Sequence, residues 1–177
     1  HSDPLNVQNY SNFDGDTNVE LPSKVDLSES EYFPPIGSQM DMNSCVAWAT
    51  TYYQFTYEAN KLNGISVDEN NASSPAWIFN LWNGGENKGS ANIEAYNLLK
   101  QYGAVTMQDA PYRTTNGSTY ISSDNFDYSW CTNSNAMIEA LNTRLIGHDV
   151  ITIPSQGTAI ENADSDSLKK IFLCVKS

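Results

Sequence analysis

A run of apolar residues at helical spacing, beginning just after Cys45, limits the folds open to this chain more than any other stretch of its sequence. The run recurs every three or four residues and consists of Trp48, Tyr52, Phe55, Ala59 and Leu62. This spacing predicts one long helix with a single apolar face. Asn43 or Ser44 can cap its start, and Asn63-Gly64 is typical of a helix end. We therefore expect a long core helix whose first turn carries Cys45.

A cysteine at this position suits nucleophilic chemistry, although a buried structural cysteine is the ordinary alternative for an isolated Cys. The N-terminus of a helix carries partial positive charge, which favours a thiolate. Gln39 lies six positions upstream and could place a side-chain N–H where negative charge develops during acyl transfer. Together the two residues favour the chemical interpretation, with Cys45 as nucleophile and Gln39 as oxyanion donor.

Three further helices are predicted in the body of the chain. The second runs from Ser74 as N-cap and Pro75 as first residue to Asn83-Gly84. The third begins at Ser90 and ends at Gly103. The fourth spans residues 136–147, and its predicted apolar face consists of Met137, Leu141 and Leu145. Residues 113–130 are rich in Ser, Thr, Asn and Asp, which predicts a long loop or irregular strands. A short strand over 150–153 and a terminal helix over 166–176 complete the pattern.

The composition excludes several classes of function. The net charge is −12, with only 9 Lys and Arg residues in 177, so nucleic acid is not an expected partner. No apolar run reaches the length of a membrane span. The histidines and cysteines are too widely spaced for a metal site, so we expect neither metal nor cofactor. Acidic residues recur at no spacing that indicates a glycosidase.

The sequence around Cys45 resembles the papain-like cysteine peptidases. In that family a Gln lies six positions before the nucleophilic Cys, as Gln39 lies before Cys45 here. The flanking runs that carry the resemblance are Leu21-Pro22 with Asp26, Phe33 to Gln39, Ala47-Trp48-Ala49, Gly89-Ser90, Tyr102-Gly103 and Ala110-Pro111-Tyr112. Met42 stands where many members have a disulfide cysteine, and Val46 replaces the usual Trp. These departures are closer to divergent bacterial members.

The resemblance implies an α+β fold, with a helical half followed by the start of a sheet half. Residues 1–20 would form a polar leader, 21–112 the helical half that carries the nucleophile, and 113–177 the beginning of an incomplete second half. The implied activity is thiol-dependent hydrolysis of protein or peptide substrates by a secreted enzyme without a cofactor. Substrate-binding positions are expected at Asn43, Ser44, Gly89 and Ser90.

A catalytic histidine and asparagine are expected about 130–150 residues after the cysteine in this family. His148 lies closer to Cys45 than that, although Gly147-His148-Asp149-Val150 resembles the family's histidine run. His148 is thus either the base or a histidine of a surface turn. The favoured expectation is a complementary C-terminal segment or second chain that carries His and Asn.

Two other functions remain open. One is a catalytically inactive papain-like module that binds a peptide or partner in the same cleft. The other, ranked lower, is a carbohydrate-binding module, suggested only by the abundance of Tyr, Trp and Asn. A disulfide between Cys131 and Cys174 is possible and would leave Cys45 free.

Overall fold

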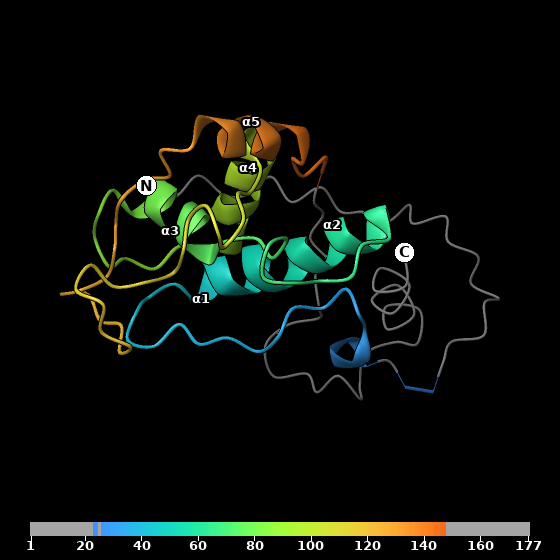
Figure 1. The fold of residues 1–177 in the computed structure, drawn as a ribbon, viewed down its shortest axis with the longest axis horizontal. Helices are drawn as coiled ribbons and strands as arrows, with labels where there is room; N and C mark the ends of the chain where they lie inside the picture. The colour runs from blue at the N-terminus through green and yellow to red at the C-terminus, as the bar shows by residue number, and fades with distance from the viewer. Residues whose placement is uncertain (1–22, 25, 148–177) are drawn as a thin grey trace, which may run out of the picture. The chain divides into compact units, whose positions relative to one another are not determined.

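A helical run from Cys45 to Asn63 lies at the centre of the part of the chain that the structure describes (Figure 1). The computed structural model describes residues 23, 24 and 26–147, of which Asp26–Gly147 pack together as one unit. The predicted leader, the strand over 150–153, the terminal helix, His148 and Cys174 lie outside the described residues. The predicted boundary between residues 112 and 113 stays a prediction, because the unit contains both sides of it.

The central run has three parts with different winding. It begins as α1 (Cys45–Ala47), continues as the π-helical segment η2 (Trp48–Phe55) and ends as α2 (Thr56–Asn63). The backbone N–H of Thr56 donates to the carbonyl of Thr51, five residues earlier, as a π-helix requires. A 3₁₀ turn, η1 (Leu27–Glu29), precedes this run.

The wide turns of η2 change which face of the helix is buried. Trp48, Tyr52 and Phe55 are buried as predicted, but Leu62 is 84% exposed, so its place on the apolar face is wrong. A π-helical turn holds more residues than an α-helical turn, so the buried face shifts along the sequence and reaches Asn60 instead.

The second predicted helix is confirmed as α3 (Pro75–Asn83). Ser74 caps it by accepting a hydrogen bond from the Trp77 backbone N–H at 3.3 Å, and Gly84 follows it in the left-handed conformation. The third is α4 (Asn92–Tyr102), which starts two residues later than predicted. The carboxylate of Glu94 accepts from the N–H of Ala91 at 2.7 Å and so closes the first turn at that point.

The fourth helix, α5 (Ser134–Asn142), presents a different face from the predicted one. Ala136 and Ala140 are buried, whereas Met137 and Leu141 are exposed, and the helix ends before Gly147. The reason is close packing of α5 against α4 (Figure 1). A Cβ on Gly103 would lie 1.8 Å from the carbonyl oxygen of Ala140, so only small residues fit at this contact.

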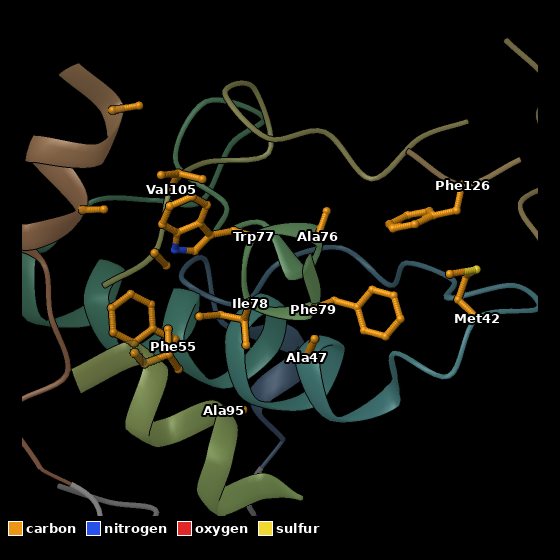
Figure 2. Close-up of a cluster of buried hydrophobic side chains, with 14 of the residues drawn as sticks. Met42, Ala47, Phe55, Ala76, Trp77, Ile78, Phe79, Ala95, Val105 and Phe126 are labelled. Atoms are coloured by element: carbon orange, nitrogen blue, oxygen red, sulfur yellow. The ribbon is translucent and has the colours of Figure 1, made fainter. Parts of the chain in front are cut away.

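The larger of two hydrophobic clusters among the described residues joins these helices, as Figure 2 shows. Ile78 and Phe79 of α3 and Leu99 of α4 are among its most deeply buried residues. Met42, only three residues before Cys45, is part of the same cluster and is 2% exposed. The segment that leads to Cys45 is thus anchored in the core by its own side chain.

The described residues contain isolated β-bridges, Ser73 with Thr106 and Thr114 with Phe126, but no strand of a sheet. They agree with the helical half of the predicted fold. The sheet half stays a prediction.

Candidate active site

Cys45 is the first residue of α1, and its side chain is exposed and free. Ser44 precedes it as the N-cap residue, and the Ser44 carbonyl accepts from the N–H of Trp48 at 3.0 Å, which closes the first turn. The thiol therefore lies at the start of the long helical run and is open to solvent.

Gln39 lies in a turn that is closed by two hydrogen bonds between Gln39 and Met42. Its side-chain Nε2 donates to the carbonyl of Met42 at 2.7 Å, and the N–H of Met42 donates to the carbonyl of Gln39 at 3.3 Å. An amide NH₂ has two N–H donors, so one remains after the bond to Met42. Met40, inside the turn, has a φ of 51°, which is uncommon for a residue with a side chain.

Aromatic side chains of η2 hold the segment that leads to Gln39. The hydroxyl of Tyr52 donates to the carbonyl of Pro35 at 3.0 Å, and the hydroxyl of Tyr53 accepts from the N–H of Gly37 at 2.9 Å. A Cβ on Gly37 would lie 2.2 Å from the ring of Trp48, so the backbone passes directly over the indole. The first turns of the nucleophile helix thus position the oxyanion candidate.

Tyr112 connects Gln39 to Ser44. Its hydroxyl donates to the carbonyl of Gln39 at 2.9 Å and lies 2.7 Å from the Oγ of Ser44. Burial raises the pKa of Tyr112 above its ordinary value, although the hydrogen bond from Ser44 opposes this shift. The residue before the nucleophile and the oxyanion candidate are therefore tied to one half-buried phenol.

The loop after α3 contacts the other side of the same segment through Asn87. The Asn87 side chain accepts from the N–H of Asn43 at 2.7 Å and donates to the carbonyl of Asp41 at 3.3 Å. The Asn43 side chain in turn donates to the Asn87 carbonyl at 3.1 Å. The loop after α3 is thus attached to the residues that lead to Cys45.

A third segment reaches the Gln39 turn at Asp41. Its N–H donates to the carbonyl of Ile121 at 3.2 Å, and its carboxylate accepts a short hydrogen bond from the hydroxyl of Tyr120. That bond to Asp41 raises the pKa of Tyr120.

The four predicted substrate-binding residues differ in how they are engaged. Asn43 uses its backbone and side-chain N–H groups on Asn87, and Ser44 is 1% exposed with its hydroxyl against Tyr112. The carbonyl of Gly89 accepts from the indole of Trp82 at 3.3 Å, and Ser90 lies half-buried shortly before α4. Their roles in substrate binding stay predictions.

Sequence reasoning did not identify three residues of this region, namely Asn87, Tyr112 and Tyr120. Tyr112 was visible as the end of Ala110-Pro111-Tyr112, and its position after a proline was the available signal. Asn87 and Tyr120 lie in polar stretches with no motif, so nothing in the sequence distinguished them.

Among residues 23–24 and 26–147, no group of three or more His, Cys, Asp or Glu side chains is arranged to hold a metal ion. In the same residues, no helix combines the length and the apolar character that a membrane span needs.

Comparison with known proteins gives one similarity of interest. The chain is 31% identical over 104 residues to a protein named Cathepsin L-like proteinase from Fasciola hepatica, a match that covers 56% of this chain and 30% of that protein. This chain thus spans less than a third of the relative's length. No family model and no solved structure matches the chain. The similarity supports a distant relationship to the papain-like cysteine peptidases.

Proposed function

We propose that this chain supplies the nucleophile and one oxyanion donor of a cysteine peptidase that hydrolyses peptide bonds. The observation that carries the proposal is that Gln39 and Cys45 are held by one connected set of contacts. The exposed thiol begins the central helix, and Tyr112 and Tyr53 tie the Gln39 segment to that helix. The relationship to a cathepsin L-like proteinase supports the same chemistry.

In the proposed reaction the sulfur of Cys45 attacks the carbonyl carbon of the scissile peptide. The S–C bond forms, and the carbonyl electron pair moves to oxygen. The remaining N–H of the Gln39 amide and the backbone N–H of Cys45 would stabilise that oxyanion. The tetrahedral intermediate then collapses, the amine leaves with a proton, and water releases the acyl group from sulfur.

An imidazole must accept the thiol proton and later protonate the amine. The two histidines of the chain, His1 and His148, lie outside the described residues. Because His148 lies closer to Cys45 than the separation of about 130–150 residues expected in the family, the proposal includes a complementary C-terminal segment or chain that carries His and Asn. It also includes the secreted location expected from the resemblance.

Replacement of Gln39 by Ala tests the proposal. Loss of one oxyanion donor lowers kcat by roughly 10²–10³-fold, so we expect this loss in Gln39→Ala when the chain is assayed on a peptide substrate together with its complement. Gln101→Ala is the matched control, because Gln101 is exposed on α4. Full kcat in a folded Gln39→Ala variant would contradict the oxyanion role. Binding of peptide without turnover by the unmodified complex would favour the inactive binding module.

A further inference from the structure

The Tyr112 hydroxyl bonds to Gln39 and to Ser44, the residue before Cys45, without being a candidate catalytic group itself. We propose that Tyr112 is a positioning residue, which fixes the Gln39 turn relative to the first turn of the nucleophile helix through a directed hydrogen-bond chain from Ser44 to Gln39. This inference rests on the proposed function, since it concerns the geometry of the oxyanion site.

The direction of the chain follows from the groups involved. A carbonyl can only accept, so the single proton of the Tyr112 hydroxyl is donated to Gln39. The Tyr112 oxygen is then left as an acceptor, and the proton between it and Ser44 must come from the Ser44 hydroxyl. The chain therefore runs from Ser44 through Tyr112 to the carbonyl of Gln39, and each bond polarises the next.

Packing holds the phenol in this position. Its ring meets the Trp48 ring edge to face at a centroid distance of 5.1 Å, and the Phe126 ring lies 4.9 Å away on centroids. Ser44 is 1% exposed, so water does not compete for its hydroxyl. Because burial raises the pKa of Tyr112, the phenol stays protonated and remains a donor across the neutral range.

Among the described residues, the hydrogen bond from Tyr112 is the one that joins Gln39 itself to another segment. The two others that Gln39 makes connect it with Met42 within the turn, while the rest of the turn is held at Asp41 by Ile121, Tyr120 and Asn87. Met40 follows with a φ of 51°, a conformation that persists only when its surroundings enforce it. Without the Tyr112 hydroxyl, we expect residues 39 and 40 to relax and the Gln39 amide to lose its fixed position against the Met42 carbonyl.

Tyr112→Phe removes only the hydroxyl, and Tyr128→Phe is a matched control. Tyr128 is also a half-buried tyrosine packed against the core, and its hydroxyl donates to a backbone carbonyl, but that acceptor is Ser123, outside the Gln39 segment. The first measurement is hydrogen exchange by mass spectrometry on the full 177-residue chain. We expect exchange of peptides covering residues 38–45 to rise about tenfold in Tyr112→Phe, as for loss of one hydrogen bond. Exchange in α3 serves as the internal reference and should not change.

The second measurement separates oxyanion stabilisation from thiol reactivity. A peptide aldehyde adds to a thiolate and forms an oxyanion, whereas 2,2′-dipyridyl disulfide reacts with the thiol without forming one. We expect Tyr112→Phe to weaken aldehyde binding about tenfold and to leave the disulfide reaction rate unchanged.

The outcomes distinguish this inference from the proposed function. Unchanged exchange over residues 38–45 in Tyr112→Phe, or an equal rise in Tyr128→Phe, would overturn the positioning role. If Gln39→Ala weakens aldehyde binding and Tyr112→Phe does not, the oxyanion proposal survives and the positioning role fails. If the unmodified chain and its variants, each measured together with the complementary segment, do not bind the aldehyde, the proposed function fails, and the exchange data alone decide the role of Tyr112.

Discussion

Cys45 and Cys131 differ in access, and this difference sets their expected reactivity. Cys45 is exposed at the first position of α1, whereas Cys131 is half-buried with its Sγ 3.9 Å from the carbonyl of Asn133. We expect iodoacetamide at mildly acidic pH to label Cys45 first, as mapped by peptide mass spectrometry. Cys45→Ser provides the control for the assignment. Preferential labelling of Cys131 or Cys174 would contradict the nucleophile role.

Gly37 lies on the approach to Gln39 and packs tightly against the Trp48 ring. An added Cβ would lie 2.2 Å from the Trp48 ring, so Gly37→Ala must displace either the indole or the backbone. We expect a loss of about 1–3 kcal/mol in the free energy of unfolding, measured with urea. Gly89→Ala is the control, because a Cβ there meets nothing within 4 Å and should change stability little.

At the scale of elements, the contact of α4 with α5 depends on Gly103. Its φ is 68° and its ψ is −161°, a region almost closed to other residues, and a Cβ would overlap the Ala140 backbone. We expect Gly103→Ala to cost more than about 2 kcal/mol in unfolding free energy. Gly64→Ala also places a side chain at positive φ after a helix but meets no atom, so it should cost about 1 kcal/mol. Equal losses would contradict the tight helix contact.

The loop of residues 114–126 is closed by Arg113 and Asp127. The Asp127 carboxylate accepts from the Ser129 hydroxyl and backbone N–H and pairs with Arg113 at 3.0 Å, and these contacts lower its pKa, the Ser129 hydroxyl most. Because the folded state favours the charged form, this stabilisation is present above the ordinary Asp pKa and disappears as the pH falls through the lowered value.

We therefore expect Asp127→Asn to lower Tm at neutral pH and to reduce the further decline of Tm between about pH 5 and pH 2. Thermal unfolding followed by circular dichroism across this range measures both effects. Asp124→Asn in the same loop is the control, since the Asp124 carboxylate has only a 3.5 Å contact with Ser123. A parallel pH profile for Asp127→Asn and the unmodified chain would contradict the expectation.

At the scale of the whole molecule, the proposed activity needs groups beyond the described residues. We expect the purified 177-residue chain to show little peptidase turnover alone and to gain turnover when a segment carrying His and Asn is supplied. A fluorogenic peptide assay together with light scattering measures activity and solution state. Robust turnover by the monomeric chain without a supplement would contradict this view and make His148 the candidate base.

The elements that the sequence predicted well are those specified locally. The cap at Ser74, the proline at the next position and Gly84 define α3 by local signals alone, so no tertiary information was needed. The buried faces of α2 and α5 were predicted less well. Leu62 is exposed because the preceding segment is wound as a π-helix. Met137 is exposed because α5 packs on α4 through its alanines. Neither cause can be recognised from the spacing of apolar residues in the sequence.

The candidate site likewise contains residues that the sequence predicts and residues that it does not. Gln39 and Cys45 are recognisable because their relation is a spacing along the chain. Tyr112 and Tyr120 contact the same turn from 73 and 79 residues away, and the meeting of such distant segments is decided by packing. The residues that the sequence predicted for the site and those that it missed therefore differ in their separation along the chain.

The π-helical winding of η2 has a consequence for how this chain could vary in length during evolution. A π-helical segment is equivalent to residues inserted into an α-helix without loss of the helix. Gain or loss of one residue between Trp48 and Phe55 could thus be absorbed by rewinding, with Cys45 and α2 both kept in place. The same change within α2 would rotate every later contact of that helix. Among natural variants, insertions and deletions of single residues should therefore be more frequent in η2 than in α2.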